Sequence, residues 1–315
     1  KDTFKLDKYI DDLKVNDNKL KVVGYYKSAD DINSYYNEED ISKDGKLFGL
    51  KDFNTTCITQ VSSTILSLLN ITPEENMDLP INEVLSLSKE KSSSPCDRIV
   101  MYNPDAIAYW IFGRFYKKYF SRLEKNVSIV LPMLSVFPPK TPVCFASMYS
   151  GLMPEAHGIK KYEKPVLKCS TVFDTLIKNG KKAAIVSTKG DSISLIFLER
   201  SMDYFIYRTV KECNKKAHEL IKSDEYDVIV LYNTDYDYWM HRNTPTGLIA
   251  QSALKPDVNE YLTLKSLIES EWKGKHKTAL AFAPDHGCHR WYGVLGQHEL
   301  NKPCDMNTVH AWSII

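Results

Sequence analysis

From about residue 53 onward, short apolar runs alternate with segments of helical periodicity, and this alternation limits the possible folds more than any other feature of the sequence. Strands are expected at 97–103, 126–134, 182–188, 203–209, 226–233 and 278–284. Helical spacing lies between them, at 106–120, 141–151, 171–180, 211–223 and 258–273. Parallel strands need a crossover connection, which a helix supplies. The pattern therefore predicts an α/β fold, a three-layer sandwich whose mostly parallel central sheet is flanked by helices.

The first 52 residues have a different texture. They are polar, with acidic and tyrosine-rich pieces such as SADDINSYYNEED, and contain one plausible strand at 20–26. Few of their residues could contribute to a hydrophobic core. We therefore expect residues 1–52 to form an N-terminal extension or subdomain and residues 53–315 to form the main domain.

Composition narrows the possible partners and the compartment. Forty-one basic and forty acidic residues give a net charge of +1, which does not indicate a nucleic-acid duplex or an anionic membrane as partner. No apolar run approaches the roughly 18 residues of a membrane span. The seven cysteines are an odd number without a CxxC pair, which favours reduced thiols and a cytoplasmic location. A removed upstream signal sequence remains compatible with a chain that starts at Lys1, and nothing in the sequence indicates an oligomeric state.

Polar side chains follow several of the expected strands. In open α/β sheets, ligands bind at the carboxyl ends of the strands. An aspartate or histidine at such a place is, taken singly, most often a turn or cap residue, but here the pattern recurs at successive strand ends. The candidates are Asp105, Thr141, Asp237, His241, Asp285, His286 and His310.

Three aspartates, three histidines and one threonine are a ligand set that suits zinc, and also manganese or iron. Asp237 and His241 are four residues apart, so a helix would place both on one side. Asp235 lies closer to the strand end and competes with Asp237, but the spacing to His241 favours Asp237. Six ligands and a hydroxyl suit two divalent metal ions, which roughly 4 Å apart can clamp an in-line displacement at phosphorus.

Thr141 has two possible roles. It precedes Pro142 at the start of a small-residue run, TPVCFASMYSG, so it can be the N-cap of a helix. Helix N-termini also favour phosphate groups, and coordination to a metal can activate a hydroxyl as a nucleophile. Both roles are compatible with one residue.

The run from Thr141 to Ile159, TPVCFASMYSGLMPEAHGI, resembles the nucleophile motif of the alkaline phosphatase superfamily, most closely of its nucleotide pyrophosphatase/phosphodiesterase branch. Asp237-Tyr-Trp-Met-His241 resembles the branch's D-x-x-x-H metal motif. Pro284-Asp285-His286-Gly287 is similar to its DHG motif, and His310 to its last metal-binding histidine. The resemblance covers about residues 53–315 and keeps the family's order of motifs.

This resemblance implies an alkaline-phosphatase-like fold and a metal-dependent phosphoesterase catalytic domain. One metal ion, usually zinc in the family, would be held by Asp237, His241 and His310. The second would be held by Asp105, Asp285 and His286 with the oxygen of Thr141, which would form a phospho-threonine intermediate. The intervals between motifs leave no room for a phosphomutase cap, and a threonine cannot mature to the formylglycine of sulfatases.

One position departs from the branch. An asparagine that helps to hold a phosphate oxygen is expected shortly after HGI, but Tyr162 stands there, preceded by Lys161. Both are candidate substrate contacts, and Trp239 is a candidate for stacking on a base. The expected substrate is a small phosphorylated molecule such as a nucleotide, hydrolysed as a phosphodiester or pyrophosphate. The alternatives are a phosphomonoesterase, or an inactive superfamily member that serves as a binding domain.

Overall fold

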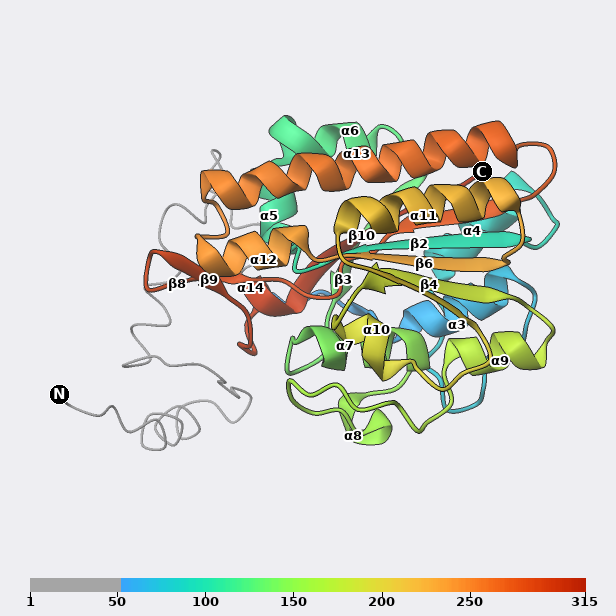
Figure 1. Ribbon diagram of the computed structural model, residues 1–315, viewed down its shortest axis with the longest axis horizontal. Helices are drawn as coiled ribbons and strands as arrows, with labels where there is room; N and C mark the ends of the chain where they lie inside the picture. Colours follow the sequence, from blue (N-terminus) through green and yellow to red (C-terminus); the bar gives the residue numbers. More distant parts are fainter. Residues whose placement is uncertain (1–51) are drawn as a thin grey trace.

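An eight-stranded sheet organises residues 52–315, the part of the chain that the computed structural model describes (Figure 1). The expected strand at 20–26 and nearly all of the expected N-terminal extension lie outside the described residues. The strand order is β1-β3-β10-β7-β2-β6-β4-β5. The strands are β1 (Thr56–Cys57), β2 (Arg98–Pro104), β3 (Ile129–Leu134), β4 (Ala183–Thr188), β5 (Asp203–Tyr207), β6 (Val228–Asn233), β7 (Thr278–Phe282) and β10 (Asn307–Ile314).

The sheet is mostly parallel. Only β10 runs antiparallel to its neighbours, β3 and β7, whereas the other pairs are parallel. The run DMNTVHAW, expected to supply a ligand, is therefore largely a strand, and all eight residues of β10 are buried. A strand buried on both faces reads as a continuous run without alternation, which is why it was not expected.

Side chains of β2 alternate between two hydrophobic cores, as a strand in a three-layer structure requires. Ile99 and Met101 point into one core, and Val100 and Tyr102 into the other. The first core is covered by α3 (Gln60–Leu68), α4 (Asn82–Lys91), α7 (Thr141–Ser150), α9 (Val172–Lys178) and α10 (Ser192–Ile196). The second is covered by α5 (Tyr109–Arg114), α6 (Ser121–Glu124), α11 (Val210–Ser223), α12 (Asp235–Arg242) and α13 (Leu248–Glu271). The predicted three-layer α/β sandwich is confirmed.

Two helices differ from the expectation. The segment 106–120 divides into α5, a π-helical turn η2 (Tyr116–Phe120) and α6. Helix α13 begins ten residues earlier than expected and continues through Pro256, although proline removes a helical hydrogen bond. The next residue, Asp257, is buried and accepts hydrogen bonds from Tyr102 and Asn233. Packing of α13 on the sheet therefore outweighs the local preference for a break.

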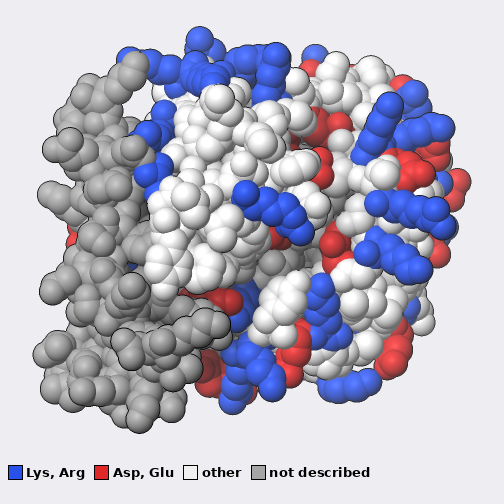
Figure 2. Space-filling model, turned by 60° about the vertical axis from the view of Figure 1, so that its left-hand side comes forward, with Lys and Arg blue, Asp and Glu red and all other residues white. Residues whose placement is uncertain are grey.

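The described surface carries both signs of charge. On the face that Figure 2 shows, basic and acidic side chains are interspersed around a large uncharged area. Within residues 52–315, no helix combines the length and the apolar character that crossing a membrane requires. The seven cysteines are all free thiols.

Candidate active site

The carboxyl ends of three parallel strands bring the predicted polar residues to one edge of the sheet. Asp105 follows β2, Asp285 and His286 follow β7, and α12, which follows β6, carries Asp237 and His241. The backbone ties these ends together, because the amide of Asp105 donates to the carbonyl of Asn233 over 2.9 Å. Asp285 Oδ1 in turn accepts from the amide of Ala106 over 3.3 Å. Ligands of open α/β sheets bind at the carboxyl ends of the strands, so the topology makes this edge the expected place for a binding site.

Asp105, Asp285 and His286 form one buried group. His286 Nε2 lies 3.5 Å from Asp105 Oδ1 and 3.4 Å from Asp285 Oδ2. The hydroxyl of Thr141 lies 3.4 Å from Asp105 Oδ2 and 3.5 Å from His286 Nε2. Asp105 Oδ2 also accepts a hydrogen bond from the hydroxyl of Tyr232. The four residues predicted to hold one metal ion and to supply the nucleophile thus lie together.

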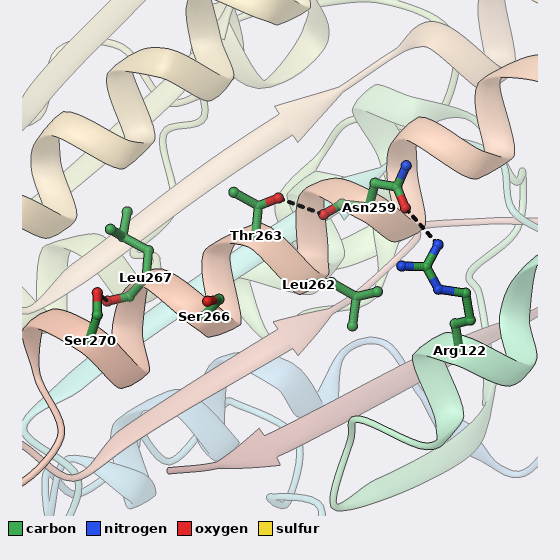
Figure 3. A pocket seen from close by; sticks show the side chains of 7 residues that line it. All are labelled: Arg122, Asn259, Leu262, Thr263, Ser266, Leu267 and Ser270. Carbon is green, nitrogen blue, oxygen red and sulfur yellow. Dashed lines mark hydrogen bonds between the residues drawn. The ribbon is translucent and has the colours of Figure 1, made fainter.

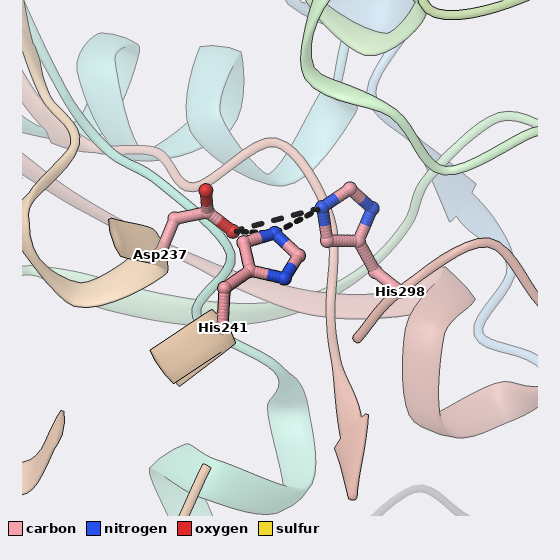
Figure 4. Close-up of side chains that lie close together, drawn as sticks. All are labelled: Asp237, His241 and His298. Atoms are coloured by element: carbon pink, nitrogen blue, oxygen red, sulfur yellow. Dashed lines mark hydrogen bonds and ion pairs between the residues drawn. The ribbon is translucent and has the colours of Figure 1, made fainter. Parts of the chain in front are cut away.

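A second group contains Asp237, His241 and His298 (Figure 4). Asp237 Oδ1 lies 3.2 Å from His241 Nε2 and 3.6 Å from His298 Nε2, and the two Nε2 atoms are 3.2 Å apart. Asp235 is the first residue of α12, where its amide bonds to the side chain of Asn233; it does not join this group. The pairing of Asp237 with His241 agrees with their spacing on one face of a helix.

His310 does not lie in this group. It sits on the central strand β10, opposite Leu131, and its Nε2 is 2.9 Å from the carbonyl oxygen of Pro284. Burial lowers the pKa of His310 to about 4, so it is neutral at ordinary pH. In the structure His298, and not His310, lies with Asp237 and His241.

A small hairpin explains why His298 reaches α12. Strands β8 (His289–Trp291) and β9 (Leu295–Gln297) pair antiparallel, and His298 follows β9 directly. Gly296 allows β9 to pack against α12, because a Cβ there would meet the sulfur of Met240 and lie 2.6 Å from its carbonyl oxygen. The carbonyl of Gly296 lies 3.1 Å from His241 Nδ1. The sequence signal was a histidine two residues after a glycine, downstream of the DHG motif.

Unpartnered buried oxygens indicate that both groups suit cations. Asp105 Oδ1, Asp237 Oδ1 and Asp285 Oδ2 are buried and have no hydrogen-bond partner within the described chain. Buried carboxylate oxygens are rarely left unsatisfied, because the loss of hydration is costly. The Nδ1 atoms of His241 and His298 each face a carbonyl oxygen, to which they donate. In the neutral rings the lone pairs of the two Nε2 atoms then face each other over 3.2 Å, without a donor between them. Oxygen and imidazole donors in this arrangement fit divalent metal ions.

The pKa shifts agree with this assessment. Burial, followed by the carboxylates of Asp285 and Asp237, raises the pKa of Asp105 well above its usual range, and burial also raises the pKa of Asp285. Burial, with His286 and His241 next, holds the pKa of His298 well below its usual range. Burial lowers the pKa of His241, but the adjacent Asp237 outweighs this effect and leaves it raised. Carboxylates that resist ionisation beside a histidine that resists protonation form an environment that a bound cation would relieve.

Thr141 is the first residue of α7, and Lys140 takes the N-cap position without a side-chain capping bond. The N-cap role expected for Thr141 is therefore not observed. Its hydroxyl is turned toward Asp105 and His286 instead. The side chain is buried, with 5% exposed.

A cavity of about 210 Å³ opens onto both groups. Tyr162 is on its wall, as expected for a substrate contact, but Lys161 is not: Lys161 is 75% exposed and pairs with Glu163 over 3.4 Å. Trp239 also lies outside the lining and packs on Tyr238. The lining also includes His298 and several residues that the sequence did not single out for this role: Lys164, Asp191, Ser192, Tyr232, Thr234, Gln297 and Glu299.

Another pocket, of about 580 Å³, lies on the outer side of α13 (Figure 3). Arg122 donates there to the side-chain oxygen of Asn259 over 3.1 Å. None of its seven lining residues is an acid, a histidine or a cysteine: they are Arg122, Asn259, Leu262, Thr263, Ser266, Leu267 and Ser270. Ligand chemistry therefore favours the smaller cavity at the strand ends.

Comparison with known proteins agrees with the site. Residues 104–175, which include Asp105 and Thr141, match the family described as type I phosphodiesterase / nucleotide pyrophosphatase. No curated protein sequence matches this chain significantly.

Three solved structures are among those similar to this chain. Murine ectonucleotide pyrophosphatase / phosphodiesterase 5, solved as an inactive form with AMP, has a TM-score of 0.50 and 15% identity; the match covers 61% of this chain and 57% of that one. Phosphonoacetate hydrolase from Sinorhizobium meliloti 1021 with phosphonoformate has a TM-score of 0.46, 15% identity and coverages of 62% and 57%. The C-terminal periplasmic domain of phosphoethanolamine transferase EptC from Campylobacter jejuni has a TM-score of 0.49, 15% identity and coverages of 70% and 80%.

At these identities the similarity shows the fold alone, and the match spans little more than half of the murine protein. The family match over residues 104–175 supports a phosphoester hydrolase. The same match agrees with the resemblance of the Thr141 motif to the nucleotide pyrophosphatase/phosphodiesterase branch.

Proposed function

We propose that this protein is a metal-dependent phosphodiesterase or nucleotide pyrophosphatase that acts through a phospho-threonine intermediate. The observation that carries the proposal is the position of Thr141. Its buried hydroxyl lies within 3.5 Å of both Asp105 and His286, at the wall of a cavity that also reaches Asp237, His241 and His298. The rings of His286 and His298 are 4.1 Å apart, so the two ligand groups are close enough to act on one phosphate.

Each group has the residues to hold one divalent ion. Asp237, His241 and His298 would hold the first, and Asp105, Asp285 and His286 the second, with the Thr141 oxygen beside it. Three histidines among the six ligands favour zinc, with manganese as the alternative. Metal ions bound there would neutralise the charge on the phosphate and make the hydroxyl a stronger nucleophile.

The residues of the chain have separate tasks in the reaction. Thr141 Oγ forms a bond to phosphorus while the bond from phosphorus to the leaving oxygen breaks, and its proton is lost to solvent or to the leaving group. Water then attacks the phospho-threonine, which restores the threonine hydroxyl and releases the phosphorylated product. Tyr232, which donates to Asp105, holds that carboxylate in place, and the buried wall of the cavity keeps the hydroxyl of Thr141 in one orientation.

Charge favours a diester over a monoester. Two divalent ions exceed the three ligand carboxylates by one positive charge, which matches the single negative charge of a phosphodiester. Lys140 adds no free charge, because it pairs with Glu299 over 2.5 Å. The monoesterase alternative would need a further cation in the cavity, and Lys164 is the lysine available on its wall.

The test is metal analysis combined with turnover of a nitrophenyl phosphodiester and of the matching monoester. We expect about two zinc ions per chain and a higher kcat/KM for the diester. A higher kcat/KM for the monoester would change the proposed substrate class to monoesters and leave the proposed site unchanged. Absence of bound metal together with no turnover of either substrate would overturn the proposed enzymatic function and support the alternative of an inactive binding domain.

Lys164 and Lys161 provide a matched pair for testing the cavity wall. Lys164 Nζ donates to the carbonyl of Gly190 over 2.7 Å at the cavity, whereas Lys161 points to solvent. We expect Lys164→Met to lower kcat/KM on the diester about three- to tenfold, the effect of one partly exposed charge worth roughly 1 kcal/mol. Lys161→Met should stay within about twofold of the parent. A larger loss in Lys161→Met than in Lys164→Met would contradict this assignment.

A further inference from the structure

The segment that carries His298 is hydrogen-bonded to the carboxylate of Asp305, which belongs to neither ligand group. Asp305, in the short helix α14 (Pro303–Met306), is fully buried. Its Oδ2 accepts hydrogen bonds from the amides of Glu299 and Leu300 over 2.9 and 2.8 Å. Both of its oxygens also lie 2.8 Å from His289 Nδ1. Because an ionised carboxylate only accepts hydrogen bonds, His289 is the donor.

The backbone of this segment is strained where Asp305 holds it. Glu299 has a φ of +142°, a region that residues with a Cβ rarely adopt. Such a conformation persists only where the surroundings enforce it. The two amide bonds to Asp305 begin at this residue and supply that constraint.

The same segment is also joined to the loop of the nucleophile. His298 Nδ1 donates to the carbonyl of Pro139 over 2.7 Å, and Glu299 pairs with Lys140 over 2.5 Å. Pro139 and Lys140 directly precede Thr141. The bond to Pro139 fixes the rotation of the His298 ring and leaves Nε2 facing Asp237 and His241.

A third metal site is the competing explanation, because ligand atoms of His289, Cys304 and Asp305 lie within 4.8 Å of one another. The hydrogen bonds argue against it. Two backbone amides already bond to Asp305 Oδ2, and a metal ion at that oxygen would have to displace them. The Nδ1 of His289 carries a proton toward Asp305 and so has no lone pair to offer.

We propose that Asp305 is a positioning residue: by holding the amides of Glu299 and Leu300, it places His298 against Asp237 and His241 and so assembles the first metal site. This inference rests on the proposed function, because it takes that group as a metal site. Residues that orient metal ligands typically change metal affinity 10- to 100-fold when they are removed.

The experiment is a Zn²⁺ titration of the metal-stripped full chain against a chromophoric chelator. We expect Asp305→Ala to weaken one of two zinc sites about 10- to 100-fold and to leave the other within about twofold. Asp305→Asn should keep both sites within a few-fold, because the amide oxygen can still accept from the two backbone amides. Under the third-metal explanation Asp305→Asn would instead lose a bound ion.

Two further variants separate positioning from general stability. Asp174→Ala removes the capping bonds of α9 and the ion pair with Arg200, and neither residue lines the cavity. This variant should lower the melting temperature without changing either zinc affinity. If Asp305→Ala does not fold, Asp305→Ser, which keeps one acceptor, should show the same one-site weakening to a smaller degree. Unchanged affinities in the Asp305 variants, with two sites in the parent, would overturn this inference alone. A parent that binds no zinc would overturn it together with the proposed function.

Discussion

Thr141→Ala is expected to lower kcat by about 10³-fold or more, as loss of a covalent nucleophile does in other hydrolases, while both zinc ions stay bound. The expectation follows from geometry. The hydroxyl lies 3.4 Å from Asp105 and 3.5 Å from His286, and no other hydroxyl of the cavity wall has both neighbours. The three carboxylates and three histidines proposed to bind the metal ions are not altered by removing one oxygen.

The measurement combines single-turnover kinetics with zinc analysis of the same sample. Thr141→Ser is the control, because it keeps a hydroxyl at the same position, and we expect it to retain most of the activity that alanine loses. Acid quenching during turnover should trap phosphate on the parent chain and none on Thr141→Ala. Turnover by Thr141→Ala at the parental rate would refute the assignment of Thr141 as the nucleophile. Loss of a metal ion from Thr141→Ala would instead show that the oxygen is needed as a ligand.

Helices and strands could be predicted where their own residues carry a clear hydrophobic periodicity or a capping signal. The strand at 226–233 and the helix at 211–223 were expected within two residues of β6 and α11. Helix α11 begins with a capping box between Thr209 and Glu212, a signal that is local in sequence. The strand end then placed Asp237 and His241 at the sheet edge, and their spacing of four residues placed them on one face of α12.

Long-range packing could not be predicted in the same way. β10 is buried on both faces, so its residues show no alternation, and the sequence predicted His310 as a metal ligand without predicting that it lies on a strand. The predicted helix begins at residue 258, whereas α13 begins at Leu248 and continues through Pro256, because the buried bonds of Asp257 to the sheet hold the helix together. His298 depends on a three-residue strand and on the absence of a side chain at Gly296. Both are properties of the packed hairpin and not of any periodicity.

His298→Ala is expected to remove the first metal ion and to lower kcat/KM on the diester by at least about 10²-fold, more than the loss of an outer-shell group would cause. His298 Nε2 lies 3.2 Å from His241 Nε2 and 3.6 Å from Asp237 Oδ1. Without the ring, only two ligands face that position. The zinc titration should show one site lost and the site of Asp105, Asp285 and His286 retained.

The matched control is His310→Gln, which changes the histidine that the motif comparison assigned to the same metal. Glutamine can keep a hydrogen bond to the carbonyl of Pro284, so we expect two bound zinc ions and a destabilisation of about 1–2 kcal/mol from the altered packing and hydrogen bonding. Chemical denaturation measures the stability, and the chelator titration measures the zinc. If His310→Gln lost a zinc ion while His298→Ala kept both, the third ligand would be His310, and the hairpin would have no part in binding the metal.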